Sequence, residues 1–430
     1  MIPLPVRVPE RHIPHPTSSS WARLTAVARR EWLAIAAGGS AVFALVTALI
    51  SVNEPERLWG MCAAGGYGAA AVAAVVVRYR GQVIAVIVSL SGALLVPLGW
   101  MIGAGLAQPE VGVVSRSAAM FLHQGTPYLG PAALSAAHSV NAYDPYLPAL
   151  IMFGMPRALL GGELFTDPRV WFGAFFAVTF LTAAAVAGAR RPGWCAAVMI
   201  ASPVVALPLS VGGDDLPVLG LMCLGLALAA RDDLGRWLPV AAGLVMGLAA
   251  AMKATAWPAL AMTLVFVLAR QGRRAVAPYL LAALGVAVAV DGATLAAHPA
   301  ATWANTVLFP LGLAEMKSPA ASALPGHLIA SAWGGGHAAD LVLIAVAALA
   351  FGIWLIASPP RSLQAAGWRL VLGLTVLFLL APASRVGYFT YPFGLAAWLL
   401  MLRVGEAAGQ AAEPAPLTEP APLTESGATR

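Results

Sequence analysis

Long apolar runs recur along almost the whole chain, separated by short polar or basic breaks. Most have roughly 17 to 25 residues, the helix length that spans a hydrocarbon core about 30 Å thick. Only 10% of the 430 residues are charged, whereas soluble domains carry about 25%. The sequence therefore predicts an all-α, polytopic bundle of transmembrane helices without a separate soluble domain.

About twelve spans are expected, within a transmembrane domain over residues 32–402. They are Trp32–Val52, Trp59–Val77, Val83–Ala107, Pro168–Gly188, Trp194–Val211, Leu216–Ala230, Trp237–Met252, Thr255–Ala269, Ala275–Ala296, Ala339–Ala357, Trp368–Ala383 and Pro392–Leu402. A basic N-terminal segment, 1–31, precedes this domain and gives no sign of a cleaved signal peptide. The tail, 403–430, is rich in Ala, Pro, Glu and Thr, and we expect it to be disordered.

Cysteines and net charge exclude two other classes of protein. Cys62, Cys195 and Cys223 fall inside apolar runs without paired spacing, so neither a disulfide framework nor a metal cluster is indicated. The net charge of +6 comes from residues that flank the spans, which membrane orientation explains without a nucleic-acid partner. We expect no metal and no cofactor.

Basic residues give the orientation, because cytoplasmic flanks of membrane proteins carry an excess of Lys and Arg. With both termini in the cytoplasm, 18 of the 25 basic residues lie inside. The seven left outside are Arg57, Arg116, Arg157, Arg169, Lys253, Lys317 and Arg385. This topology predicts a multi-pass protein of the cell membrane with two long outer loops, 108–167 and 298–338.

One segment decides this topology. Tyr146–Leu160 is apolar but short, and Pro148, Pro156 and Arg157 interrupt it. If it crossed the membrane, every later loop would change sides, and the basic residues would divide 12 inside to 13 outside. We therefore expect it to stay on the outer side as an interfacial or re-entrant helix.

Two acidic residues of the first outer loop are candidate catalytic bases. Glu110 opens an amphipathic helical pattern that Gly125 and Pro127 end, and Asp144 stands in the sequence NAYDPYLP. A carboxylate at the outer end of a span can take the proton of an acceptor hydroxyl. The alternative for each is an ordinary interfacial charge.

Asp214 and Asp215 form a second acidic pair, in the turn VGGDDLP between two short spans. Asp215 is in position to cap the following helix, which is a structural role. Metal binding or contact with an acceptor are the functional alternatives.

Two isolated cations stand at predicted outer helix ends. Lys253 is the one charge in the apolar stretch from Trp237 to Ala269, and Arg385 lies in PASRVGYFTYP beside Tyr388. A charge at the bilayer centre costs about 2.5 to 3.5 kcal/mol or more, so both side chains must reach the interface or a polar cavity. They could bind a lipid phosphate, or they could simply extend to the headgroups.

The second outer loop and the known enzyme motifs give no further site. His298, His327 and His337 are too far apart to predict a metal centre, and contacts of Trp303 or Asn305 with sugar or lipid would be unspecific. The chain has no GxxxxGK[ST], GxSxG or HExxH motif.

Several motifs taken in order resemble glycosyltransferase family 87, in particular its actinobacterial branch. They are Glu110 followed by GTPY (Gly125 to Tyr128), NAYDPYLP, DPRVWF, GGDD, GLAAAMKATAWP around Lys253, and PASRVGYFTYP. The likeness extends over nearly all of residues 32–402. The family consists of GT-C type membrane enzymes, including mannosyltransferases, that use polyprenyl-phosphate sugars.

This resemblance implies roles for individual residues. Family members place an acidic general base some 18 residues before a Pro-Tyr pair, and Glu110 occupies that offset from Tyr128, with Glu where Asp is more common. Lys253 and Arg385 match positions that contact the donor phosphate. Weaker contacts with donor or acceptor are expected from Tyr128, Asp214, Asp215 and Tyr388.

The combined interpretation is an inverting hexosyltransferase on the outer face. Glu110, with Asp144 as second choice, would deprotonate an acceptor hydroxyl of an envelope glycan or glycolipid, while Lys253 and Arg385 stabilise the departing polyprenyl phosphate. Membrane lipids are its other partners. A transporter or lipid flippase, and a catalytically inactive relative acting as a scaffold, remain the alternatives.

Overall fold

The computed structural model describes residues 18–77, 79–231, 235 and 237–410. This part of the chain is all α, apart from short 3-10 and π segments and one isolated bridge between Ala321 and Ser384, and it contains no sheet. The predicted all-α class is confirmed. Most of the expected N-terminal segment and of the repetitive tail lies outside the described residues.

The number of candidate spans is smaller than the twelve expected. Eight helices of the described chain are long and apolar enough to cross a membrane, or nine if α9 (Pro192–Ala201) and α10 (Pro203–Val211) form one span. They are Glu31–Ile50, Glu54–Val76, Gly81–Gly103, Pro168–Val186, Ala254–Gln271, Arg273–Ala297, Gly336–Ala357 and Leu363–Leu380. The expected span Pro392–Leu402 lies within the helix Thr390–Gln410, which is not among these candidates. Two other expected spans are too short, because Leu216–Ala229 has 14 residues and Trp237–Met252 has 16. Those lengths reach about 21 and 24 Å.

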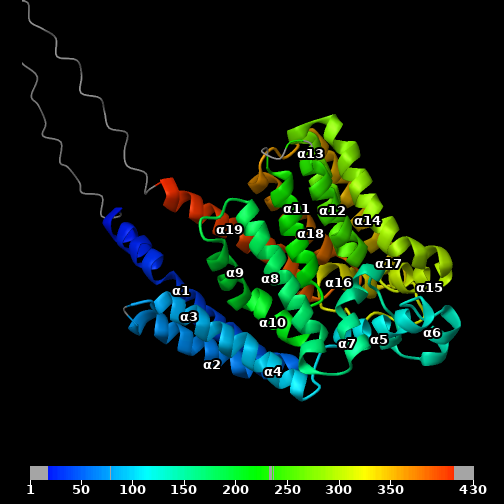
Figure 1. The fold of residues 1–430 in the computed structure, drawn as a ribbon, viewed down its shortest axis with the longest axis horizontal. Helices are drawn as coiled ribbons and strands as arrows, with labels where there is room; N and C mark the ends of the chain where they lie inside the picture. Colours follow the sequence, from blue (N-terminus) through cyan, green and yellow to red (C-terminus); the bar gives the residue numbers. More distant parts are fainter. Residues whose placement is uncertain (1–17, 78, 232–234, 236, 411–430) are drawn as a thin grey trace, which may run out of the picture. The chain divides into compact units, whose positions relative to one another are not determined.

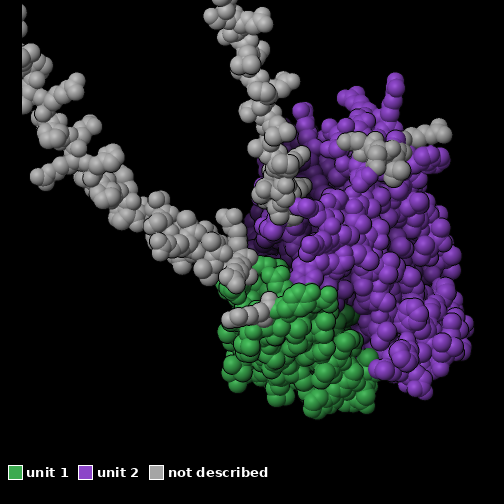
Figure 2. Space-filling model, turned by 60° about the vertical axis from the view of Figure 1, so that its left-hand side comes forward, with its two compact units in different colours: residues 1–107, 201–211 green, residues 108–200, 212–430 purple. Residues whose placement is uncertain are grey.

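Two compact units make up the chain (Figure 2). Unit 1 holds residues 1–107 and 201–211. Its helices are α1 (Ser18–Ile50), α2 (Glu54–Val76), α3 (Gly81–Leu90), the π segment η1 (Ser91–Leu95), α4 (Val96–Gly103) and α10 (Pro203–Val211). Small residues let its helices approach closely: a Cβ at Gly60 of α2 would lie 2.6 Å from the Ala44 carbonyl oxygen of α1.

Unit 2 holds residues 108–200 and 212–430. Its longer helices are α5 (Pro109–Gln124), α8 (Pro168–Val186), α9 (Pro192–Ala201, at the boundary), α11 (Leu216–Ala229), α12 (Trp237–Met252), α13 (Trp257–Gln271), α14 (Val276–Ala297), α17 (Gly336–Ala357), α18 (Leu363–Leu380) and α19 (Thr390–Gln410). Its shorter α-helices are α6 (Pro131–Ala137), α7 (Met155–Leu160), α15 (Pro299–Trp303) and α16 (Pro325–Ala332). The 3-10 and π segments are η2 (Val140–Ala142), η3 (Pro148–Phe153), η4 (Leu164–Thr166), η5 (Ala254–Ala256), η6 (Arg273–Ala275), η7 (Ala304–Leu308) and η8 (Val386–Phe389).

The centre of unit 2 is α11, a helix that is apolar on every side and nearly all buried. It packs between α8 and α12, and glycines set the spacing: a Cβ at Gly220 would overlap Thr179 of α8. A Cβ at Gly225 would likewise overlap Met246 of α12. Because α11 faces protein rather than lipid, it does not need the length of a lipid-exposed span.

The first long loop forms short helices at one end of unit 2 (Figure 1). The expected helix after Glu110 is α5, and Gly125 ends it in the left-handed region at φ 72°. The decisive segment Tyr146–Leu160 is broken into η3 and α7, six residues each, too short for either to span a bilayer. Leu150, Ile151 and Phe153 of η3 are buried in protein.

Helix α19 continues to Gln410, seven residues beyond Arg403. The expected tail, 403–430, shares its first eight residues with this helix. Residues 18–31 likewise belong to α1. The EPAPLT repeats lie outside the described residues.

Candidate functional site

Several helices of unit 2 begin or end where the predicted site residues stand. Helix α11 starts directly after Asp215, α12 ends directly before Lys253, and α18 ends five residues before Arg385. Contacts between their side chains join these helix ends, and Glu110 in the first turn of α5 reaches the same place. Residues that are up to 275 positions apart therefore form one charged cluster.

Lys253 lies at the centre of this cluster and is 6% exposed. Its Nζ is 2.8 Å from Asp214 Oδ2 and also contacts Asp215 Oδ1. The ammonium is 4.7 Å from the centre of the Tyr146 ring. Helix α12 is interrupted at Lys253, whose extended backbone (φ −150°) turns the chain into η5. This interruption lets a lysine in an apolar stretch meet two carboxylates.

Asp215 has a second partner in place of the helix cap that its position suggested. Its side chain makes no capping hydrogen bond. Instead, the hydroxyl of Tyr391 donates to Asp215 Oδ1 at 2.7 Å, and Thr255 donates to the Tyr391 hydroxyl at 3.0 Å. Sequence reasoning missed Thr255 and Tyr391 as members of the cluster, although Tyr391 follows Arg385 in the noted motif.

Glu110 and Arg385 form the second ion pair. Arg385 Nη2 contacts Glu110 Oε1, and the guanidinium lies 5.4 Å from the centre of the Tyr388 ring. Glu110 is buried, and its other carboxylate oxygen, Oε2, has no hydrogen-bond partner in the described chain. The Arg385 side chain is 36% exposed, so the proposed base and the accessible cation are direct neighbours.

Electrostatic interactions connect the two ion pairs. Burial alone would lower the pKa of Arg385, but electrostatic interactions with Tyr388, Glu110, Tyr146 and Asp214 outweigh it and raise that pKa above its ordinary value. Arg385 therefore stays charged at any physiological pH.

Asp144 lies beside the cluster without an ion-pair partner in the described chain, and it is 2% exposed. Its Oδ1 accepts a hydrogen bond from the Tyr146 backbone at 3.0 Å. Burial raises the pKa of Asp144 to about 6. A carboxylate with such a pKa is suited to general base catalysis near neutral pH.

The second long loop holds both site segments in place. Asn305, which is completely buried, accepts from the Asp144 backbone at 2.9 Å and donates to the Leu129 carbonyl at 3.0 Å. Ser322 donates its backbone N–H to the Ser384 carbonyl at 3.0 Å, directly before Arg385. The sequence indicated only an unspecific contact for Asn305, because its partners are 161 and 176 residues away.

Tyr128, the Pro-Tyr tyrosine, packs against the same segment. Its hydroxyl donates to the Tyr146 carbonyl at 2.7 Å, and the side chain is buried. All eight predicted site residues thus lie in or directly around the cluster. No group of three or more potential metal ligands occurs among the described residues.

Comparisons with known proteins give one match. The model of glycosyltransferase family 87 matches residues 145–382, a range that includes Tyr146, Asp214, Asp215 and Lys253. No curated protein and no solved structure matches the chain. The match covers more than half of the 430 residues and confirms the resemblance seen in the motifs. This multi-pass membrane protein therefore belongs to glycosyltransferase family 87.

Proposed function

We propose that this chain is an inverting, GT-C type hexosyltransferase that moves a sugar, such as mannose, from a polyprenyl-phosphate donor. The acceptor is a hydroxyl group of an envelope glycan or glycolipid on the outer face of the cell membrane. The observation that carries this proposal is the direct contact of Glu110 with Arg385 within the charged cluster. It brings a potential base next to an accessible cation.

The reaction is one displacement. The acceptor oxygen bonds to the anomeric carbon, the bond from that carbon to the phosphate oxygen breaks, and Glu110 takes the proton of the acceptor hydroxyl. The leaving group is the polyprenyl phosphate anion, whose charge the guanidinium of Arg385 stabilises. Attack from the side opposite the leaving group inverts the anomeric centre.

The ion pair suggests how donor binding prepares the base. Arg385 presents a planar guanidinium that fits a phosphate as well as a carboxylate. When a donor phosphate takes over Arg385, Glu110 loses its cationic partner and becomes free to accept a proton. Lys253 adds a buried positive charge to the cluster. Its contacts with Asp214 and Asp215 hold the cluster together.

Arg385→Gln should raise the donor KM by about 10- to 100-fold, because a hydrogen bond to a charged group contributes about 1.5 to 3 kcal/mol. Steady-state kinetics over a range of donor concentrations would measure this change. Arg361→Gln, at an exposed arginine, is the matched control and should leave KM unchanged. An unchanged donor KM in Arg385→Gln would exclude Arg385 as the phosphate ligand.

The function itself is tested by incubating the purified chain in liposomes with defined polyprenyl-phosphate sugars and envelope extract. We expect the sugar to appear on an acceptor and polyprenyl phosphate to be released in equal amount. Movement of intact donor between leaflets would instead identify a flippase. The absence of both transfer and movement with every donor would support the inactive scaffold.

One observation favours the transporter alternative. Asp291 and Asp340 are buried within candidate spans, and each has a carboxylate oxygen without a hydrogen-bond partner in the described chain. Buried acids within spans are typical of transport pathways. Glycosyl transfer remains the better-supported function, because the charged cluster and the family both agree with it.

A further inference from the structure

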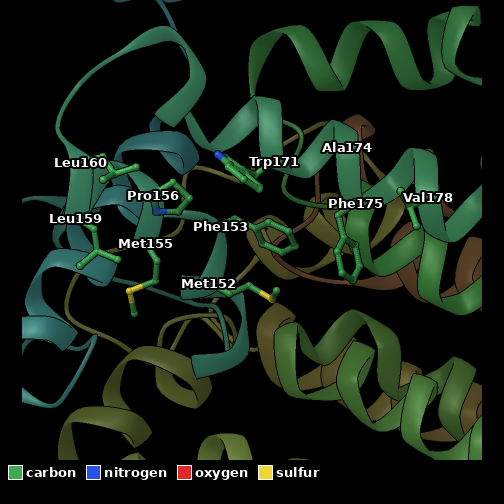
Figure 3. A pocket seen from close by; sticks show the side chains of 10 residues that line it. All are labelled: Met152, Phe153, Met155, Pro156, Leu159, Leu160, Trp171, Ala174, Phe175 and Val178. Carbon is green, nitrogen blue, oxygen red and sulfur yellow. The ribbon is translucent and has the colours of Figure 1, made fainter.

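An apolar groove of about 640 Å³ lies between η3, α7 and the first turns of α8 (Figure 3). Met152 and Phe153 line it from η3, Met155 and Leu159 from α7, and Trp171 and Phe175 from α8. None of its ten lining side chains is charged. The indole N–H of Trp171 already donates to the Phe165 carbonyl at 2.9 Å.

This lining suits a hydrocarbon chain. A peptide or a sugar would lose hydrogen bonds to solvent in the groove without replacing them, whereas a hydrocarbon has none to lose. Phe153 packs against Phe175 with the ring centres 5.3 Å apart, which gives the groove a firm wall. Met152, Leu159 and Trp171 are 44%, 66% and 45% exposed, so the groove is open on the surface of a candidate membrane span.

Arg157 is a cation next in sequence to the groove lining. Arg157 follows the lining residue Pro156 on α7, and its side chain is 41% exposed. It forms an ion pair with Asp167 at 3.6 Å, a distance longer than a hydrogen bond.

Asp167 is already neutralised by another arginine. Arg169 is buried and donates to both Asp167 oxygens, at 2.9 and 3.0 Å. Glu163, four residues before Asp167, uses its carboxylate to cap the Thr166 backbone N–H. Arg157 thus makes no hydrogen bond within the described chain and has an exposed guanidinium beside an apolar groove.

We propose that the groove and Arg157 form a binding site for an anionic phospholipid of the bilayer. One acyl chain fills the groove, and the phosphate accepts hydrogen bonds from the Arg157 guanidinium, whose fork matches phosphate oxygens. The site is separate from the proposed donor site, where Arg385 has its own partner in Glu110. Since η3 starts two residues after Tyr146, a bound lipid would stabilise the segment that covers Lys253.

The test measures lipid binding by the delipidated full-length chain in detergent, using native mass spectrometry and thermal unfolding. We expect dioleoyl-phosphatidylglycerol to bind and to raise the unfolding midpoint. Dioleoylglycerol, which lacks the phosphate, should bind about tenfold more weakly. Arg157→Gln should weaken the binding of phosphatidylglycerol by a similar factor. Ala174→Trp, which fills the groove, should weaken the binding of both lipids.

Two matched controls separate this site from general lipid contact. Ala185 lies on the same face of α8, three turns beyond Ala174, and does not line the groove. Ala185→Trp and Arg361→Gln should bind phosphatidylglycerol like the wild-type chain.

Equal affinity in Arg157→Gln and Arg361→Gln would overturn the phosphate contact, and equal affinity in Ala174→Trp and Ala185→Trp would overturn the groove. Displacement of phosphatidylglycerol by polyprenyl phosphate, together with a higher donor KM in Ala174→Trp, would assign the groove to the donor and overturn the proposal. If a tryptophan variant does not fold, a phospholipid with a photoreactive acyl chain replaces it. That probe should label α7 and α8 in the wild-type chain, and labelling spread over all spans would contradict the site.

Discussion

Glu110→Gln should lower kcat for sugar transfer by about 10²- to 10⁴-fold, because the amide cannot take a proton from the acceptor hydroxyl. The residue is 8% exposed, so water does not easily replace it as the proton acceptor. Transfer of radiolabelled sugar at saturating donor would measure kcat. The same change also removes the ionic partner of Arg385.

Three further variants separate the base from the ion pair. Glu110→Asp keeps a carboxylate, one methylene shorter, and should retain measurable transfer. Glu163→Gln removes an exposed acid of the same loop and should leave kcat unchanged. Full activity in Glu110→Gln together with loss of activity in Asp144→Asn would make Asp144 the base, whose pKa of about 6 is compatible with that role.

Lys253→Met should destabilise the folded chain by about 3 to 5 kcal/mol, the usual cost of removing one partner from a buried ion pair. Methionine fills nearly the same volume, so the loss arises from charge rather than from a cavity. Asp214, which is buried, and Asp215, which is partly buried, would then lack the ammonium that neutralises them. A lower unfolding midpoint in detergent, and little transferase activity, are the expected results.

The chain provides its own control, because Lys317 is its one other lysine and is exposed. Lys317→Met should leave the midpoint unchanged. Adding Asp214→Asn and Asp215→Asn to Lys253→Met removes the unpaired charges and should restore much of the stability without restoring activity. A midpoint like that of the wild type in Lys253→Met alone would show that the buried cluster is not an ionic one.

The expected number of spans shows where sequence reasoning reaches its limit. Apolar runs located the long helices of the predicted transmembrane domain, including α11 and α12, but not the short helices α6, α15 and α16 of its loops. They did not show that α11 is enclosed by protein, because a buried helix and a lipid-exposed helix have the same apolar sequence. Only the packing around Gly220 and Gly225 makes that distinction.

The candidate site shows the same division. Each of Glu110, Asp214, Asp215, Lys253 and Arg385 was recognisable as a charge at a predicted helix end, since a charge next to an apolar run is a local feature. Their partners were not recognisable. Lys253 was expected to contact phosphate, and the structure pairs it with two aspartates 38 and 39 residues earlier.

The long apolar runs determined by themselves that this protein is a helical membrane protein, because run length and composition act locally along one chain. The tertiary structure alone decided that Arg385 meets Glu110, 275 residues earlier, and that Asn305 holds Asp144. Such contacts depend on how helix ends converge in space. Helix packing through small residues fixes that convergence, and no single segment encodes it.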